Sequence, residues 1–106
     1  MSTFILFRES HLEGLKHDKN KEDWTLVPWT AMDQVVAGLT YGANKYDRHN
    51  WKKVDPQRYH AAAMRHISAY LQGKVIDRES GLHHLAHACC NLLIALEHDT
   101  TNIGTD

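Results

Sequence analysis

The spacing of apolar residues along the chain predicts helices and no strands. Over residues 30–46, apolar side chains recur at three- and four-residue steps, which is the spacing of one helix face. Thr30 is the expected N-cap of this helix, and a polar loop follows over residues 47–55. No segment alternates apolar and polar residues as a half-buried strand does, so the sequence predicts an all-α fold. The face consists of Met32, Val35, Val36, Leu39, Ala43 and Tyr46.

Two further helices follow the loop. The second is expected over residues 56–71, because Pro56 suits a first turn and Gly73 suits a position just past a helix end. The third is expected over residues 82–98. Three short helices cannot cover apolar faces of this width, so we expect a small helical bundle that is completed by homo-oligomerisation. The third helix carries the widest stripe, with Leu82, Leu85, Ala86, Cys89, Leu92, Leu93 and Leu96.

The chain has 106 residues, which corresponds to a single domain over residues 1–106. Residues 1–28 lack a clear hydrophobic period and are expected to form an irregular arm before a helical core at residues 29–98. Trp24, Leu26 and Val27 are expected to pin this arm to the core. No apolar run approaches the ~18–20 residues that a membrane span needs, and the N-terminus has no signal-peptide pattern.

Charge and cysteine content limit the possible functions and location of the protein. The chain has 12 basic and 13 acidic side chains, so no basic excess exists to drive binding to duplex nucleic acid. Cys89 and Cys90 are adjacent and cannot staple a fold, which is typical of a reducing cytosol, and we expect a cytoplasmic protein. The 9 histidines are an unusually large number for this length, and histidine is the commonest metal ligand.

The histidines suggest a metal site. On the third helix, His84, His87, Asn91 and His98 share one stripe nearly opposite the leucines. The pair formed by His84 and His87 can hold one cation, although a solvated polar face is the alternative. On the second helix His66 lies on the apolar face, where a hydrogen-bonded core histidine is the alternative. Three imidazoles with the carboxylate of Glu79 would suit Mn²⁺, Fe²⁺, Co²⁺ or Zn²⁺, whereas Mg²⁺ prefers carboxylate oxygen.

A second group of residues is cationic and aromatic. Arg58 and Arg65 are seven residues apart on one helix edge, beside His66, and an arginine fork matches phosphate oxygens in pairs. Tyr46 and Trp51 can stack on a nucleotide base. A solvated charged face is the alternative for the lysines. The predicted substrate-binding residues are Lys45, Tyr46, Asn50, Trp51, Arg58 and Arg65.

Four successive blocks resemble a known family. They are KHDKNKEDWTLVPWTAM, YGANKYDRHNW, RYHAAAMRHISAYLQG and DRESGLHHLAHACCNLLIALE, and together they span about residues 16–97. The chain resembles a phage family of dATP/dGTP diphosphohydrolases, relatives of the MazG-like all-α nucleoside triphosphate pyrophosphohydrolases. The resemblance implies metal-dependent hydrolysis of a purine deoxynucleoside triphosphate to the monophosphate and pyrophosphate.

The resemblance also implies roles for particular residues. His66, Glu79, His84 and His87 would hold the metal, and Glu79 or Asp77 would orient or deprotonate the attacking water. MazG-like enzymes hold metal with acidic ExxE and ExxD pairs on helices. On its last helix, where such a pair is expected, this chain has HLAH, from His84 to His87. That departure leaves open a nucleotide-binding protein that sequesters its ligand without hydrolysis. A helical assembly module is a third alternative, but it does not explain the ESGL and HLAH blocks.

Overall fold

The computed structural model describes residues 13–102, which fold into helices joined by short loops. Within residues 13–102 there is no strand, and the β-type pairing is an isolated bridge between Ile76 and His83. The all-α prediction is therefore confirmed. The elements are the 3-10 turn η1 (Trp24–Leu26), α2 (Trp29–Lys45), the 3-10 turn η2 (Asn50–Lys53), α3 (Pro56–Leu71) and α4 (His84–Asn102).

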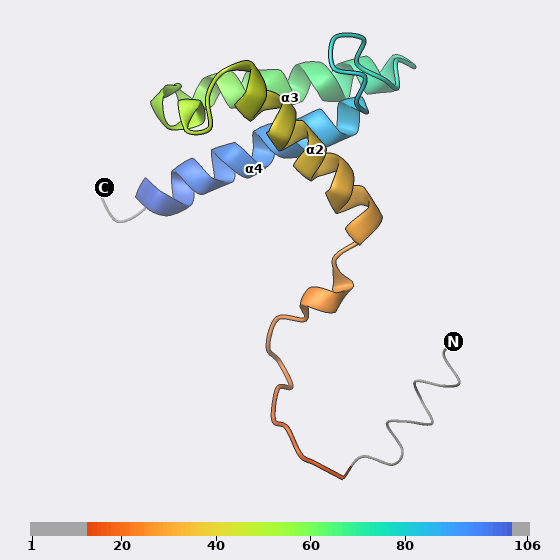
Figure 1. Ribbon diagram of the computed structural model, residues 1–106, viewed down its shortest axis with the longest axis vertical. Coiled ribbons are helices and arrows are strands. Elements are labelled where there is room, and N and C mark those ends of the chain that lie inside the picture. The colour runs from red at the N-terminus through yellow and green to blue at the C-terminus, as the bar shows by residue number, and fades with distance from the viewer. Residues whose placement is uncertain (1–12, 103–106) are drawn as a thin grey trace.

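Helix α4 is the element against which both other helices pack (Figure 1). Helix α3 runs antiparallel to α4, because His66 meets His84 at one end of the pair and Tyr59 meets His98 at the other. Helix α2 crosses α4 at a steeper angle than α3 does (Figure 1). The two helices that carry the predicted metal ligands are thus direct neighbours.

The ends of α3 follow the sequence signals. The Asp55 carboxylate accepts a hydrogen bond from the backbone N–H of Gln57 (3.0 Å), and Pro56 is the first helical residue. Gly73 adopts a φ of 91° just past the helix, and its N–H donates to the carbonyl of Tyr70 (2.9 Å). The left-handed conformation favours glycine at this position.

The starts of α2 and α4 differ from the expected ones. Helix α2 begins at Trp29 with Pro28 in the N-cap position and no side-chain cap, so the prediction of Thr30 as N-cap is wrong. Helix α4 begins at His84 rather than at residue 82. The reason is that the backbone of Leu82 is engaged elsewhere, since its carbonyl accepts from the N–H of Asp77 (2.8 Å).

Small residues bring α2 and α4 into close contact. A Cβ at Gly38 would lie 2.6 Å from Sγ of Cys90, so a larger residue cannot occupy this position unless the Cys90 side chain or one of the two helices shifts. The Cys90 thiol donates to the carbonyl of Val35 (3.0 Å), and burial raises its pKa to about 11. The buried apolar residues are Val35, Ala63, Ala86, Ala88, Cys90 and Ala95.

The leucine stripe of α4 faces outward. Leu92 is 50% exposed and Leu96 is 62% exposed, whereas His87 and His98 are buried. The histidine stripe is therefore not a solvated polar face; it is the face that packs on α3. Because the largest apolar side chains of α4 remain outside, the helices within this chain leave the main apolar face of the fold uncovered.

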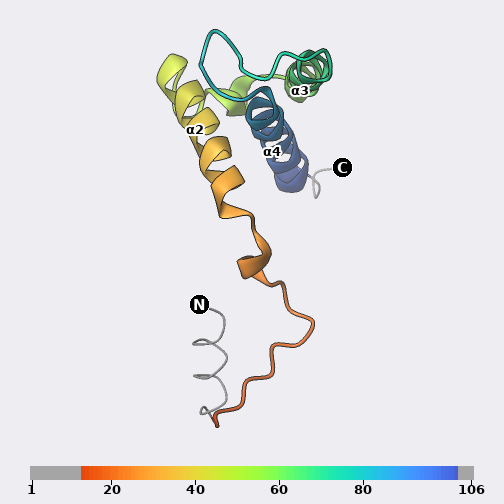
Figure 2. The same cartoon turned by 90° about the vertical axis from the view of Figure 1, so that its right-hand side faces the viewer.

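Residues 13–28 of the predicted N-terminal arm extend away from the helices (Figures 1 and 2). Trp24 is 74% exposed and Leu26 is 79% exposed, so the prediction that they pin the arm to the core of the same chain is wrong. Val27 is half-buried. Residues 1–12 of the predicted arm lie outside the described residues. None of the described helices combines the length and the apolar character needed to cross a membrane.

Replacing Gly38 with alanine tests the contact between α2 and α4. The new methyl group would collide with Sγ of Cys90, and we expect Gly38→Ala to lower the free energy of unfolding by roughly 1–3 kcal/mol in urea titrations. Gly42→Ala is the matched control on the same helix. No atom beyond its own helix lies within 4 Å of that added carbon, so Gly42→Ala should stabilise the fold by about 0.5–1 kcal/mol.

The double variant Gly38→Ala, Cys90→Ala removes the colliding sulfur. If the collision is the cause, Cys90→Ala should be less destabilising in the Gly38→Ala background than in the wild type. Equal effects in the two backgrounds would mean that the alanine is accommodated without touching α4.

Candidate functional site

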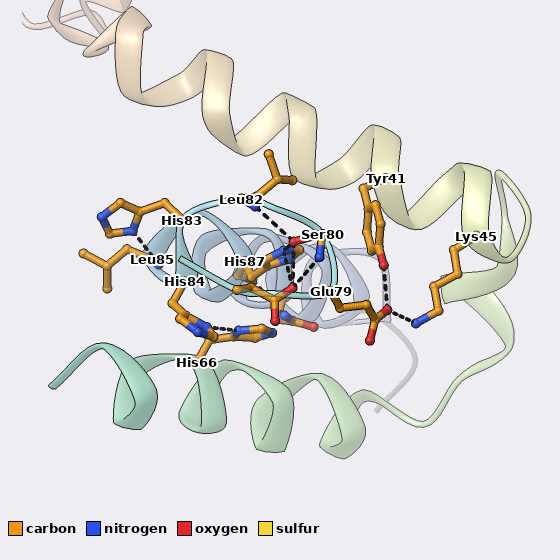
Figure 3. A network of polar contacts seen from close by, with 12 residues as sticks. Tyr41, Lys45, His66, Glu79, Ser80, Leu82, His83, His84, Leu85 and His87 are labelled. Carbon is orange, nitrogen blue, oxygen red and sulfur yellow. Dashed lines mark hydrogen bonds and ion pairs between the residues drawn. The ribbon is translucent and has the colours of Figure 1, made fainter. Parts of the chain in front are cut away.

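Three histidines converge where α3 meets the start of α4, and we call them the histidine cluster: His66, His84 and His87 (Figure 3). Nδ1 of His66 lies 2.8 Å from Nδ1 of His84. The ring of His66 stacks on the ring of His87, with centroids 4.7 Å apart and an angle of 16° between the planes. The antiparallel pairing of α3 and α4 therefore brings together the three imidazoles that the sequence offered as metal ligands.

The surroundings of His66 and His87 favour neutral imidazoles. Burial, followed by the nearby rings of His87 and His84, lowers the pKa of His66 below its ordinary value. Burial also lowers the pKa of His87, although the carboxylate of Asp77 opposes this shift. The contact between the two Nδ1 atoms needs one protonated and one unprotonated nitrogen. Neutral imidazole is also the form that binds metal ions.

A tight turn before α4 holds Asp77 and Ser80 against His87. Oδ2 of Asp77 accepts from the N–H of Ser80 (3.0 Å) and from its hydroxyl (2.7 Å). Oγ of Ser80 lies 2.6 Å from Nε2 of His87. Because Ser80 has one hydroxyl proton, which goes to Asp77, His87 is the donor through Nε2. Nδ1 of His87 is then its unprotonated nitrogen.

The turn also keeps Asp77 ionised. Burial acts to raise the pKa of the Asp77 carboxyl, but the hydrogen bonds from the Ser80 hydroxyl and N–H outweigh it, so the pKa lies below the ordinary value. Oδ2 of Asp77 is 3.6 Å from Nε2 of His87. Gly81 closes the turn at a φ of 76°, and its N–H donates to the carbonyl of Asp77 (2.8 Å).

Glu79 joins this turn to α2. Its Oε2 accepts from the hydroxyl of Tyr41 (2.6 Å) and from the ammonium of Lys45, with which it forms an ion pair (Figure 3). These two hydrogen bonds, that of Lys45 first, lower the pKa of the Glu79 carboxyl. The edge of the Tyr41 ring faces His87 at 6.0 Å between centroids. Glu79 therefore lies beside the cluster and is already paired with a cation.

The predicted substrate residues fall into two groups. Lys45, through its ion pair with Glu79, and Arg65, through its neighbour His66, lie near the histidine cluster, whereas Tyr46 lies within electrostatic range of Tyr59. The Lys45 ammonium is 5.3 Å from the centre of the exposed Tyr46 ring, and the exposed Arg65 precedes His66 on α3. Arg58 is exposed about two turns nearer the start of α3.

Asn50 and Trp51 belong to the other end of the helix pair. The carbonyl of Trp51 accepts from Nε2 of His98 (2.9 Å), and its ring packs edge-on against the His98 ring at 5.2 Å. His87 and His98 are eleven residues apart on α4, which is about 16 Å along the helix. Within one chain, the structure does not bring Asn50 and Trp51 to the histidine cluster.

The donor types of the cluster suit a transition metal, since three imidazoles and a nearby carboxylate are nitrogen and oxygen ligands. As the side chains stand, no group of three or more His, Cys, Asp or Glu within residues 13–102 is arranged to hold a metal ion. The reason is visible in the His66–His84 pair. Two nitrogen ligands of one tetrahedral ion lie about 3.3 Å apart, whereas these Nδ1 atoms are at hydrogen-bonding distance, 2.8 Å. Metal binding would require this hydrogen bond to open.

Sequence reasoning missed Tyr41 and Ser80 as contributors to the site. Ser80 had a usable signal, because Asp77 followed three residues later by serine and then glycine is typical of a side-chain-capped turn. Tyr41 had none, because its contact with Glu79 joins residues 38 positions apart in sequence.

The fold and the cluster define a small all-α domain with three histidines and an ionised aspartate at one end of an antiparallel helix pair. A family model described as "dATP/dGTP diphosphohydrolase, N-terminal" matches residues 11–106. The chain therefore belongs to this dATP/dGTP diphosphohydrolase N-terminal family, as the sequence blocks indicated.

A relative from Salmonella phage PMBT28, named dATP/dGTP diphosphohydrolase, is 33% identical over 82 residues. The match covers 77% of this chain and 28% of the relative, so the chain spans less than a third of the length of that protein. No solved structure matches the chain.

Replacing Ser80 with alanine tests the turn that holds the cluster. The substitution removes the hydroxyl between Asp77 and His87 and leaves both part-buried groups short of a partner, so we expect destabilisation on the order of 1–2 kcal/mol. Ser68→Ala is the control, because the exposed Ser68 hydroxyl contacts the Gln72 side chain on the surface of α3. Its effect should stay within about 0.5 kcal/mol. Equal unfolding midpoints for the two variants would contradict the role given to Ser80.

Proposed function

We propose that this domain takes part in the hydrolysis of a purine deoxynucleoside triphosphate to the monophosphate and pyrophosphate. The observation that carries the proposal is the convergence of the histidine cluster with the ionised Asp77. Exposed cations beside this site, Lys45 and Arg65, supply charge for a triphosphate. The name of the phage relative supports a deoxypurine substrate. MazG-like ancestry would agree with the all-α fold.

We assign the proton-accepting role to Asp77. Its carboxylate is ionised at neutral pH, and its link through Ser80 keeps His87 in one tautomer and orientation. A water beside Asp77 could lose its proton to the carboxylate as it attacks phosphorus. Glu79, proposed from the sequence for this role and as a metal ligand, is instead held by Lys45 and Tyr41. We assign it to the positioning of Lys45.

A divalent cation would be held by the unprotonated nitrogens of His66, His84 and His87, once the His66–His84 hydrogen bond opens. The chemistry that such an ion supplies is neutralisation of phosphate oxygens. Mn²⁺, Fe²⁺, Co²⁺ or Zn²⁺ suits three imidazoles better than Mg²⁺ does. Tyr46 would stack on the base, and Arg58 and Arg65 would bind phosphate oxygens.

Purified protein should release pyrophosphate from dATP or dGTP when a divalent metal is present, and a chelator should abolish the release. Arg65→Met should lower turnover at least tenfold, because ~1.4 kcal/mol of lost transition-state stabilisation corresponds to that factor. Lys21→Met, in the arm, is the control and should retain wild-type turnover. A folded Arg65→Met variant with unchanged turnover would remove Arg65 from the site.

One observation favours binding without hydrolysis as the second candidate. His66 and His84 already satisfy each other by a direct hydrogen bond at 2.8 Å, so the cluster is stable without an ion. A protein that binds dATP or dGTP, takes up no metal and releases no pyrophosphate would be a nucleotide-sequestering protein. Metal analysis together with the pyrophosphate assay separates the two functions.

We also propose that the leucine stripe of α4 is covered by the same face of a second copy. Leu85, Cys89, Leu92 and Leu96 follow one another at steps of four, three and four residues, which is the spacing of a helix-pairing seam. The stripe carries no charged residue, so two copies can meet on a two-fold axis without like-charge repulsion.

Light scattering should therefore show a homo-oligomer at micromolar concentration. The variant Leu92→Glu, Leu96→Glu should be monomeric, because it places charges in the seam. Leu71→Glu is the control, since Leu71 is also exposed but lies at the end of α3. A monomeric wild-type protein would contradict the proposal.

A further inference from the structure

The connection between α3 and α4 forms an open groove beside the histidine cluster. The groove has a volume of about 490 Å³ and is lined by Lys74, Ile76, Asp77, Arg78 and His84. His84 is also the partner of His66 in the cluster, so the groove reaches the cluster itself. Its cations, Lys74 and Arg78, are distinct from the arginines of α3.

Lys74 continues the groove onto α3. It also lines a neighbouring hollow of about 460 Å³, whose other lining residues are Met64, Arg65, Ser68, Ala69 and Gln72. The two hollows therefore share a wall. They place Arg65, Lys74 and Arg78 along one continuous surface that leads to His84.

Several hydrogen bonds hold the backbone of the loop that forms the groove. The N–H of Lys74 donates to the carbonyl of Ala69 (3.0 Å), which fixes the chain just past α3. The N–H of His84 donates to the carbonyl of Val75 (2.8 Å), and an antiparallel bridge joins Ile76 to His83. The loop that carries the cations is thus tied to the ends of both helices, and little ordering of its backbone is needed for a ligand to bind.

The charges of the groove favour an anion. Neither Lys74 nor Arg78 forms an ion pair with another residue in the range 13–102, unlike Lys45, which is paired with Glu79. The side chains that line this surface include three cations and one carboxylate, that of Asp77. Oδ2 of Asp77 is occupied by Ser80 on the side of His87, so part of its charge is already compensated.

We propose that this groove is the subsite for the pyrophosphate part of the substrate, with Arg78 and Lys74 holding the two terminal phosphates. The proposal rests on the proposed function, because it orients the triphosphate with its α-phosphate toward the histidine cluster and its leaving group toward the loop. Arg78 can bind two phosphate oxygens through its planar fork, and Lys74 supplies a point charge. The same subsite would bind inorganic pyrophosphate as a product.

Titration with inorganic pyrophosphate in metal-free buffer, followed by calorimetry, tests the subsite directly. The wild-type protein should bind pyrophosphate, and affinity should fall as salt increases. Lys74→Met and Arg78→Met should each weaken binding at least tenfold, while Lys21→Met should bind as the wild type does. Both groove residues are exposed, so these variants should keep the helical circular dichroism spectrum of the wild type.

A second measurement needs no variant. In wild-type protein, pyrophosphate should shift the backbone amide resonances of residues 74–78 and of His84, and leave those of residues 13–23 unchanged. Absence of pyrophosphate binding at millimolar concentration would overturn the subsite, and so would unchanged affinity in folded Lys74→Met and Arg78→Met proteins. Shifts confined to residues outside the groove would also overturn it.

The outcomes separate this subsite from the hydrolytic function. If pyrophosphate binds in the groove but dATP and dGTP are not hydrolysed, the subsite stands and the hydrolysis proposal fails. If hydrolysis occurs while Lys74→Met and Arg78→Met leave both the KM and the inhibition by pyrophosphate unchanged, the subsite fails and hydrolysis stands.

Discussion

The packing of the histidine face of α4 against α3 is the contact on which the rest of the structure depends. Alanines on both helices allow the two backbones to approach, and the imidazoles fill the remaining space by stacking and by hydrogen bonding. His87 is buried on this face, and a buried polar ring needs hydrogen-bond partners. Ser80 provides one from the loop between the helices, and Asp77 in turn accepts from the Ser80 hydroxyl. One contact therefore fixes the helix pair, the cluster and the loop.

The loop gives the site its electrostatic character. Asp77 is held ionised by Ser80, and Glu79 is held ionised by Lys45 and Tyr41. The two carboxylates come from the same turn and have different partners. Asp77 faces His87 of the cluster, whereas Glu79 reaches across to α2. Such a separation of environments is how neighbouring acidic groups take different roles in one site.

The sequence was sufficient for the helices and for the placement of His84 and His87 on one stripe, because both depend on short-range spacing. The end of α3 followed from Gly73, and the shared stripe of His84 and His87 followed from their separation of three residues. The sequence did not indicate whether this histidine stripe faces α3 or the solvent. A leucine face and a histidine face lie on opposite sides of α4, and hydrophobicity alone would turn the leucines toward α3. Ser80 and Asp77, which contact His87, instead favour an orientation in which the histidines face α3.

This orientation connects the site with assembly. Because α4 uses its polar face to contact α3, its leucines are left for another surface, and a second copy can cover them. Trp24 and Leu26, in the segment before α2, are also exposed. In an assembly built on α4, Asn50 and Trp51 of one copy need not serve the cluster of their own chain. The distance of about 16 Å between His87 and His98 along α4 excludes direct contact within a chain but not between copies. In the proposed assembly, substrate recognition and oligomerisation would be two consequences of one helix orientation.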